Sequence, residues 1–263
     1  MKRYFTGNKY ETTENKRNIF DKLFLNSRWY FVYGYGKVVL KGRNLAVKNK
    51  YDTEEWADSS YTIVECIEKS GGRLFIDGMD NITKHDGPVV FVSNHMSTLE
   101  TFVFPCIIAP LKEVTYVVKD SLVTMPIFGP IMRSRNPIVV SRKNSRQDLL
   151  NVINKGKEIL AEGRSIVLFP EGTRQEQFSP EKFNSLGIKL AKEAGVPVIP
   201  VAIKTDFWGN GKLIKDIGPI HRKEPVCMSF GEPITITGNG KAEHKQIIEF
   251  ITEKTNEFKS IKI

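Results

Sequence analysis

The sequence predicts an α/β protein with a single core domain, in which helices flank a mixed, partly parallel sheet, preceded by an N-terminal arm. Three observations lead to this prediction. From residue 73 onward, short apolar runs rich in β-branched residues alternate with segments of helical spacing. The length of 263 residues suits one large domain, or one domain with an arm. The formal net charge of +9 lies wholly within residues 1–50, which hold 12 basic and 3 acidic side chains.

The arm, residues 1–72, is basic and aromatic in its first part and helical in its second. Five of the seven residues from 29 to 35 are aromatic, and glycines at 34 and 36 leave both helix and strand open. Acidic side chains at 52–55 suit the positive end of a helix dipole. Apolar residues then keep helical spacing to Ile67, and Gly71-Gly72 ends the pattern, which predicts an amphipathic helix.

The α/β domain, residues 73–263, follows with its elements in order. The buried runs that predict strands are residues 73–77, 88–93, 114–118, 137–141, 164–169, 196–203 and 225–230. The segments that predict helices are residues 145–160, 182–194 and 241–259. Ser145 and Asp148 resemble a capping box at the start of the first of these helices.

Composition excludes several classes of protein. A hydrophobic content of 40% with 26% charged residues excludes general disorder. The longest uncharged runs, residues 87–99 and 101–111, are shorter than the roughly 18–20 apolar residues of a spanning helix. Charges throughout residues 1–28 leave no apolar signal-peptide core. Three widely spaced cysteines, at 66, 106 and 227, indicate reduced cytosolic thiols, with no disulfide framework and no metal spacing.

His95 has the most informative setting of the four histidines. It directly follows a predicted buried strand, where α/β folds place their reactive groups. Glu100 can reach it only if His95 lies in the turn before a helix that carries Glu100, since five residues along one helix rotate by about 500°. The carboxylate would then fix the imidazole tautomer, and the other ring nitrogen could accept a proton. From the spacing alone, a packed histidine with an unrelated glutamate is an equal alternative.

Cationic side chains follow three further predicted strands. Lys119 and Arg142 each come directly after an apolar run, and a third run leads into residues 169–174, Phe-Pro-Glu-Gly-Thr-Arg. An arginine fork suits phosphate, although a solvated surface side chain is the usual explanation of each group by itself. If the strands are parallel, their carboxyl ends gather one base and three cations at one edge of the sheet. The pattern therefore predicts a site for a phosphate-bearing hydroxyl compound.

These blocks resemble the sequence motifs of the PlsC-type glycerophospholipid acyltransferases, the lysophosphatidic acid acyltransferases. The four blocks stand here in the family's order as Asn94-His95…Glu100, Phe128-Gly129…Ile138-Val139-Val140-Ser141-Arg142, residues 169–174 and residues 196–201. The resemblance covers roughly residues 73–235. One departure is Glu100, because the family usually has aspartate five residues after the histidine. Glutamate keeps the charge but is one methylene longer.

The resemblance implies transfer of a fatty acyl group from acyl-CoA or acyl carrier protein to the sn-2 hydroxyl of 1-acylglycerol 3-phosphate, which gives phosphatidic acid in phospholipid biosynthesis. His95 would act as general base and Glu100 would orient it, without a covalent acyl-enzyme. The residues expected to hold the acceptor's phosphate or shape its pocket are Lys119, Arg142, Glu171, Gly172, Thr173 and Arg174. No metal and no further cofactor are expected.

The basic aromatic arm then acquires a physical role, because both lipid substrate and lipid product lie in a bilayer. Basic residues attract anionic headgroups, and Trp and Tyr favour the interface. We expect peripheral, monotopic attachment to the cytoplasmic face of a membrane. The alternative is that these aromatics pack on the core and the charges are merely solvated.

Rival functions stay open on the sequence alone. Within the same chemistry, the acceptor could be another lysolipid or glycerol 3-phosphate. From other classes, a basic arm could mark a nucleic-acid-binding protein, and Glu100 could mark an inactive membrane-binding scaffold. Nucleic acid is disfavoured as a partner, because the excess charge is confined to the arm and no helix–turn–helix, zinc or RRM-type motif occurs.

Overall fold

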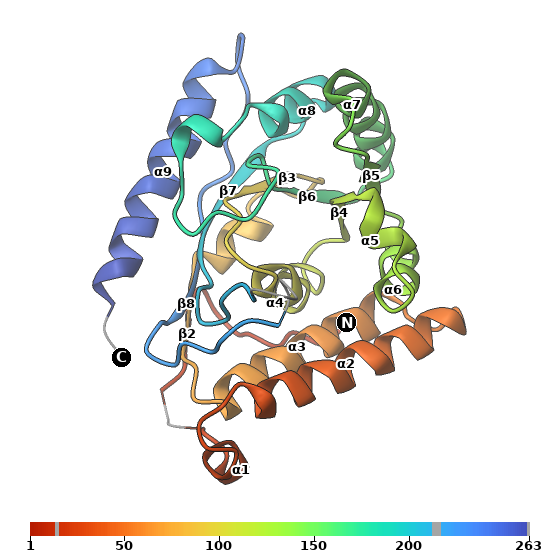
Figure 1. Cartoon of the computed structure of the whole chain (residues 1–263). Coiled ribbons are helices and arrows are strands. Elements are labelled where there is room, and N and C mark those ends of the chain that lie inside the picture. Colours follow the sequence, from red (N-terminus) through yellow and green to blue (C-terminus); the bar gives the residue numbers. More distant parts are fainter. Residues whose placement is uncertain (14–15, 212–216, 262–263) are drawn as a thin grey trace.

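The computed structural model describes residues 1–13, 16–211 and 217–261, and its centre is one mixed, mostly parallel sheet with helices on both faces (Figure 1). The strands are β1 (Tyr10–Glu11), β2 (Leu74–Asp77), β3 (Val90–Ser93), β4 (Val114–Lys119), β5 (Ile138–Val140), β6 (Ser165–Leu168), β7 (Val198–Lys204) and β8 (Val226–Phe230). Their order across the sheet is β1-β2-β8-β7-β3-β6-β4-β5. The predicted fold class is therefore confirmed.

The direction of the strands places the ends of five of them at one edge. β3 runs parallel to both of its neighbours, β6 and β7. β4 is parallel to β6 and to β5, so β3, β4, β5, β6 and β7 share one direction. β8 is antiparallel to β7 and parallel to β2, and these two strands run the other way. The carboxyl ends of β3 to β7 consequently meet at one edge, where open α/β sheets bind their ligands.

Helices cover the sheet from both sides (Figure 1). The helices are α1 (Ile19–Leu23), α2 (Trp29–Val47), α3 (Thr53–Lys69), α4 (Leu99–Ile108), α5 (Asp120–Thr124), α6 (Phe128–Ser134), α7 (Ser145–Ala161), α8 (Leu186–Ala194) and α9 (Lys241–Ser260), with short 3₁₀ helices at Met79–Thr83 and Pro180–Lys182. Along β3 the side chains alternate between two cores. Phe91 belongs to the core with α2, α3 and α4, whereas Val90 and Val92 belong to the core with α7, α8 and α9.

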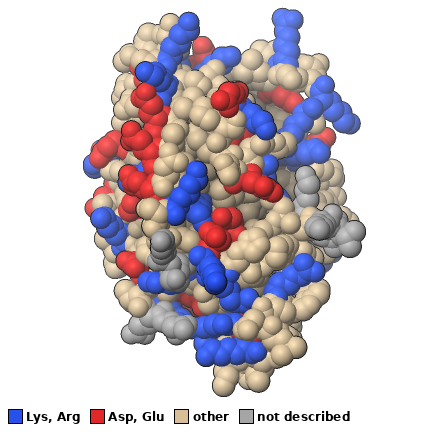
Figure 2. Space-filling model, turned by 60° about the vertical axis from the view of Figure 1, so that its left-hand side comes forward, with Lys and Arg blue, Asp and Glu red and all other residues tan. Residues whose placement is uncertain are grey.

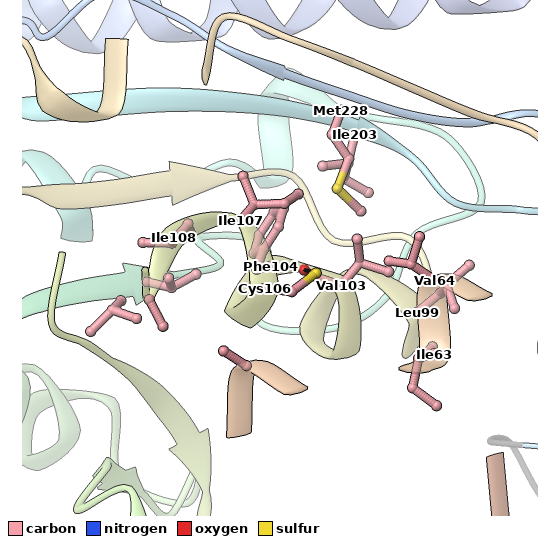
Figure 3. Close-up of a cluster of buried hydrophobic side chains, with 14 of the residues drawn as sticks. Ile63, Val64, Leu99, Val103, Phe104, Cys106, Ile107, Ile108, Ile203 and Met228 are labelled. Atoms are coloured by element: carbon pink, nitrogen blue, oxygen red, sulfur yellow. Dashed lines mark hydrogen bonds between the residues drawn. The ribbon is translucent and has the colours of Figure 1, made fainter. Parts of the chain in front are cut away.

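Helix α4 is apolar on nearly every side because it lies between the sheet and α3. Figure 3 shows its buried side chains between Ile63 and Val64 of α3 and Ile203 and Met228 of the sheet. Pro105 stands inside the helix, where the ring disturbs the regular hydrogen bonds. The Ser60 hydroxyl of α3 enters this gap: it accepts from the Cys106 N–H at 2.9 Å and donates to the Phe102 carbonyl at 2.6 Å. A polar contact thus fixes α3 against the kinked helix.

The aromatic stretch whose structure the sequence left open is helical. In α2, Gly34 allows close packing, since a Cβ there would lie 2.7 Å from the Cys66 sulfur of α3. Phe31 is fully buried and its ring meets the edges of Phe207 and Trp208, while Tyr33 on the same helix is exposed. One hydrophobic cluster therefore includes residues on both sides of the predicted boundary at residue 72.

Two local predictions were wrong. The helix expected over 182–194 begins only at Leu186. The residues before it form a 3₁₀ turn and a loop, in which the Asn184 side-chain oxygen accepts the Leu186 N–H at 2.9 Å. The capping box of α7 does not form either. Its N-cap is Asn144, which accepts from the Gln147 N–H, and Asp148 turns back to the loop that precedes the helix.

Candidate active site

A cavity of about 570 Å³ lies at the sheet edge where the carboxyl ends of β3, β4, β5 and β6 meet. Of the eight residues predicted from the sequence, five line this cavity, from four different strand ends. These five are His95, Lys119, Arg142, Gly172 and Arg174. Glu100, Glu171 and Thr173 are not among the residues that line it, and each has a separate position described below.

The turn between β3 and α4 brings His95 and Glu100 together. Asn94 ends β3 with a two-way bond to β7, because its amide donates to the Ile203 carbonyl at 3.0 Å and accepts the Ile203 N–H at 2.8 Å. His95 follows in the turn, and Glu100 occupies the first turn of α4. The Nδ1 atom of His95 lies 2.7 Å from Glu100 Oε1. The helix that the spacing required is thus present, and the Nε2 atom of His95 remains as the basic nitrogen.

The Glu100 carboxylate is completely buried, and several donors satisfy it. Oε1 accepts from the main-chain N–H groups of Met96 and Ser97 at 2.8 and 3.0 Å, in addition to His95. Oε2 accepts from the Ser97 hydroxyl at 3.0 Å and from the Thr205 hydroxyl at 2.7 Å. Burial by itself raises the pKa of Glu100, but hydrogen bonds and the charge of His95 outweigh burial and hold that pKa below its ordinary value. Glu100 is therefore ionised at neutral pH.

The loop after β6 holds His95 from three directions. The Phe169 ring stacks on the imidazole, with ring centres 4.4 Å apart. The Glu171 carboxylate accepts the main-chain N–H of His95 at 2.6 Å, and the Gln175 N–H donates to the His95 carbonyl at 2.8 Å. The sequence had assigned Glu171 to the pocket of the acceptor's phosphate. The structure places it instead against the backbone of the proposed base.

Glu171 has an unusual protonation equilibrium for a glutamate. Burial raises the pKa of its carboxyl to about 7, although the His95 N–H favours the charged form. The nearby charge of Glu100 acts in the same direction as burial. A carboxyl that titrates near neutral pH thus contacts the backbone of His95.

Arg142 owes its position to Asp148 of α7. The backbone of Arg142 is left-handed, with a φ of 58°. Residues other than glycine rarely adopt this conformation. Asp148 accepts the main-chain N–H groups of Ser141 and Arg142 at 2.8 and 2.7 Å and so fixes this turn. The guanidinium of Arg142, which lines the cavity, is half-buried, and this burial lowers its pKa.

The two other predicted cations, Lys119 and Arg174, line the cavity and come from the ends of different strands. Lys119 ends β4 and precedes α5. Arg174 follows β6, and its Nη1 lies 3.3 Å from Asn210 Oδ1. Thr173 is exposed, and its hydroxyl accepts from the Gln175 side chain. The loop from 169 to 174 therefore presents Gly172 and Arg174 to the cavity, while Glu171 contacts His95.

One side of the cavity is almost wholly apolar. It lies between α2, α3, α4, β4 and α6, and the large side chains that line it are Val38, Val39, Tyr51, Trp56, Phe102, Tyr116, Leu122, Phe128, Ile131 and Met132. The opposite side, between α7 and α8, mixes apolar side chains with polar ones such as Ser145, Asn184 and Lys189. His95 stands between an apolar and a polar environment.

Sequence reasoning missed three contacts that support the site. Thr205, Phe169 as a stacking ring, and Asp148 were not assigned to it. The signal for Thr205 and Phe169 was their place directly after β7 and β6, whose ends lie beside that of β3. Among the described residues, no group of three His, Cys, Asp or Glu side chains is close enough to hold a metal ion.

The sequence model of the family described as Acyltransferase matches residues 73–204, about half of the chain. A "1-acyl-sn-glycerol-3-phosphate acyltransferase" of Pseudomonas aeruginosa is 35% identical over 172 residues, which cover 65% of this chain and 64% of that protein. The "Lyso-ornithine lipid O-acyltransferase" of the same organism is 29% identical over 168 residues, which cover 59% and 63%. The chain thus spans less than two thirds of the length of these curated relatives.

The fold also has a counterpart of known structure. The crystal structure of the 1-acyl-sn-glycerophosphate (LPA) acyltransferase PlsC from Thermotoga maritima matches with a TM-score of 0.62 and 21% sequence identity. The match covers 92% of this chain and 98% of that one. At this level of identity the likeness concerns the fold.

The titration of Glu171 predicts a pH-dependent stability. Between its ordinary pKa near 4.5 and its raised pKa of about 7, the folded protein binds a proton that the unfolded chain does not. Stability contributed by this proton is present below pH 4.5 and is lost as the pH rises through 7. Glu171→Gln is neutral throughout and keeps an oxygen for the His95 N–H. Urea unfolding at pH 5 and pH 8 should therefore show a smaller loss of stability toward pH 8 in Glu171→Gln than in the wild type.

Glu176→Gln is the matched control, since Glu176 is an exposed residue of the same loop. Its difference in stability between the two pH values should equal that of the wild type. An unchanged pH difference in Glu171→Gln would show that Glu171 does not titrate in this range.

Proposed function

The chain belongs to the acyltransferase family, and from that premise we propose that it transfers a fatty acyl group from an acyl thioester to the sn-2 hydroxyl of 1-acylglycerol 3-phosphate, giving phosphatidic acid. The observation that carries the proposal is the 2.7 Å bond between His95 and the buried Glu100, at a cavity lined by the predicted cations Lys119, Arg142 and Arg174. The name of the similar Pseudomonas protein supports the same acceptor. His95, Glu100 and the predicted cations Lys119, Arg142 and Arg174 all fall within the matched family segment.

The proposed reaction needs one base and no covalent intermediate. Glu100 accepts a hydrogen bond from the Nδ1–H of His95. The other ring nitrogen, Nε2, is then free of a proton and can take the proton of the acceptor's hydroxyl. The oxygen then attacks the thioester carbonyl, the new C–O bond forms, and the C–S bond breaks. The proton held on Nε2 passes to the departing thiolate, and the neutral imidazole is restored. The stacked Phe169 ring and the backbone contacts of Glu171 and Gln175 keep the imidazole in place during both transfers.

The acceptor's phosphate is assigned to the cationic part of the cavity. Lys119, Arg142 and Arg174 come from the ends of β4, β5 and β6 and line the same space as His95. Guanidinium groups donate in a planar fork that matches phosphate oxygens, and ammonium groups add a point charge. Three cations on one small surface favour an acceptor with a phosphate over a neutral lysolipid.

The apolar side of the cavity is assigned to the acyl chain that is transferred. Its walls are aromatic and aliphatic side chains from α2, α3, α4, β4 and α6, and they start beside His95. Burial of a methylene group contributes roughly 0.8 kcal/mol. A long acyl chain placed there would bring its thioester carbonyl to the end of the cavity where the base stands. Acyl-CoA and acyl carrier protein present the same reactive group to this site.

Related acceptors and inactive variants are the competing functions. The similarity to a lyso-ornithine lipid O-acyltransferase favours an acceptor of another lysolipid class as the second candidate. An inactive scaffold requires that glutamate at position 100 disrupts the pair. Against this, Glu100 bonds His95 at 2.7 Å, a normal charge-assisted hydrogen-bond length.

We further propose that the protein binds a membrane surface through α1 and the exposed face of α2. Helix α1 turns its acidic side chain inward and leaves Lys22 exposed: Asp21 is fully buried and pairs with Arg17 at 2.6 Å and with Arg222 at 2.8 Å. Large apolar side chains of α1 and the residues after it point outward. These exposed side chains are Ile19, Phe20, Leu23, Phe24 and Leu25. An apolar surface held in water by ion pairs on its inner side fits an interfacial anchor.

Basic residues surround this apolar surface. In Figure 2 the lower end of the molecule, where Figure 1 places α1, is a protrusion without charge bordered by Lys and Arg side chains. Anionic headgroups attract such residues by about 1 kcal/mol each near the surface. Among the helices of residues 1–13, 16–211 and 217–261, none has both the length and the apolar character that crossing a bilayer requires.

A second group of exposed apolar side chains lies beside the cavity. Met125 and Ile127, between α5 and α6, are exposed, and Met125 lines the cavity. This segment lies against α2, since Arg43 donates to the Pro126 carbonyl at 3.2 Å. We propose that an acyl chain enters the cavity past this exposed apolar segment.

Replacing the base should abolish acyl transfer. His95→Ala removes the proposed general base, and turnover should fall by at least about 100-fold. Purified protein with lysophosphatidic acid and an acyl thioester, followed by release of the free thiol, measures this. His85→Ala, in the loop before β3, is the control and should keep full activity. Activity of His95→Ala near the wild-type level would refute the mechanism.

Replacing Arg174 should weaken binding of the phosphate-bearing acceptor. A hydrogen bond to a charged group contributes about 1.5–3 kcal/mol, so Arg174→Ala should raise the KM for lysophosphatidic acid roughly 10- to 100-fold. The KM for monoacylglycerol, which lacks the phosphate, should change little. Lys192→Ala, an exposed cation of α8, should affect neither acceptor. Equal effects of Arg174→Ala on both acceptors would contradict a phosphate contact.

Membrane binding should depend on the apolar side chains of α1. A triple variant, Phe20→Ser, Leu23→Ser and Leu25→Ser, removes three exposed apolar groups worth roughly 1.5–3 kcal/mol each when buried. Flotation with phosphatidylglycerol-containing vesicles should show partitioning reduced at least about 100-fold. The control is Leu150→Ser, an exposed leucine on α7. Point variants are preferable to deleting residues 1–50, because Phe31 and Tyr35 belong to the core.

A further inference from the structure

The Thr205 hydroxyl contacts the Glu100 oxygen that His95 does not use. Thr205 Oγ1 lies 2.7 Å from Glu100 Oε2, whereas His95 Nδ1 lies 2.7 Å from Oε1. The Ser97 hydroxyl lies 3.0 Å from both Glu100 Oε2 and Thr205 Oγ1 and completes a triangle of polar atoms. All three residues are buried. In this setting each hydrogen bond to the carboxylate counts, because water does not replace a lost donor.

Thr205 reaches this point because β7 is the neighbour of β3. Thr205 is the first residue after β7, and His95 is the second residue after β3, so both lie at the same edge of the sheet. The Asn94 side chain bonds β7 at Ile203, and the Thr205 N–H contacts the Met96 sulfur at 3.2 Å. The end of β7 is thus fixed against the turn that holds His95 and Glu100. Thr205 does not line the cavity, so its hydroxyl acts on the site through Glu100.

The length of the Glu100 side chain matches this arrangement. Glutamate spans the distance between His95 on one side and Thr205 on the other, with both contacts at 2.7 Å. Aspartate would withdraw the carboxylate by about one C–C bond, roughly 1.5 Å. With α4 held in the core by its buried side chains, contacts of 2.7 Å would lengthen beyond hydrogen-bond range.

We propose that Thr205 is a positioning residue for the His95–Glu100 pair, and that its contact makes glutamate the working carboxylate at position 100, where the resembling family usually has aspartate. This inference rests on the proposed acyl transfer for its kinetic consequences, but its geometric content concerns the pair alone. Thr205 holds the far oxygen of the carboxylate, and the near oxygen then faces Nδ1 of His95. Glu100 and Thr205 therefore act together on His95.

The kinetic test compares Thr205→Val with Thr205→Ser. Valine keeps the shape but lacks the hydroxyl, and serine restores it. A hydrogen bond to a charged group contributes about 1.5–3 kcal/mol. Its loss in Thr205→Val corresponds to a roughly 10- to 100-fold fall in kcat. The KM values of both substrates should stay unchanged, and Thr205→Ser should recover most of the rate. The control is Thr115→Val, since Thr115 of β4 is equally buried but donates to the Arg135 carbonyl at the end of α6.

Glu100→Asp separates positioning from general stabilisation. Although it restores the family's usual residue, it should lower kcat at least as much as Thr205→Val. In the Glu100→Asp background the contact to Thr205 is already lost, so adding Thr205→Val should change kcat by less than about threefold. A Thr205→Val kcat within about twofold of wild type, a fully active Glu100→Asp, or additive losses in the double variant would each overturn the proposal.

A measurement without substrate keeps this test independent of the proposed reaction. In the ¹⁵N-histidine-labelled protein, the Nδ1–H of His95 bonded to Glu100 should give a downfield proton resonance that is missing in His95→Gln. This resonance should persist in Thr205→Ser and Thr115→Val and should shift or broaden in Thr205→Val and Glu100→Asp. If wild-type protein transfers no acyl group, the proposed function fails. If the resonance is the same in Thr205→Val, the positioning role fails.

Discussion

The fully buried charge of Glu100 is the constraint on which the rest of the site depends. An ionised carboxylate in a protein interior is costly unless donors surround it. Here the donors come from the turn after β3, from the imidazole of His95 and from the end of β7. The carboxylate also lies in the first turn of α4, where the helix dipole favours negative charge. The turn cannot shift without breaking several of these bonds, and this fixes the orientation of His95.

Strand order then separates the chemistry from the binding of substrate. β3 leads into His95, the proposed base. Its neighbour β6 leads into Phe169 and Glu171, which contact His95, and its neighbour β7 leads into Thr205, which contacts Glu100. The cations follow β6, β4 and β5, progressively farther from β3 across the sheet. A parallel arrangement places all these ends at one edge. The distance between base and cations is thus set by strand spacing, about 4.8 Å per strand.

Sequence alone could predict the parts that depend on local pattern. Apolar runs located the strands, and four of these runs, which form β3, β4, β5 and β6, lead into predicted side chains that line the cavity at one edge of the sheet. It could not find Thr205, because that contact depends on the pairing of β3 with β7, more than 100 residues apart. Glu171 is a similar case, because its contact with the His95 N–H depends on how the loop after β6 folds against the turn after β3. Asp148 suited a capping box by spacing, but a left-handed turn at Arg142 offered it two stronger main-chain donors.

The aromatic helix near the N-terminus shows how one element joins two environments. Phe31 and Tyr35 on its inner face belong to the core, Val38 and Val39 line the cavity, and other side chains such as Tyr33 face outward. Asp21, a buried acidic side chain of residues 1–50, forms ion pairs with two arginines. These pairs neutralise its charge where the N-terminal segment packs on the rest of the protein. In the proposed mode of membrane binding, α2 contacts the bilayer with one face and lines the cavity proposed for the acyl chain with another. Since each methylene exposed to water costs roughly 0.8 kcal/mol, a short path from membrane to site lowers the barrier to bringing a long chain to the thioester end.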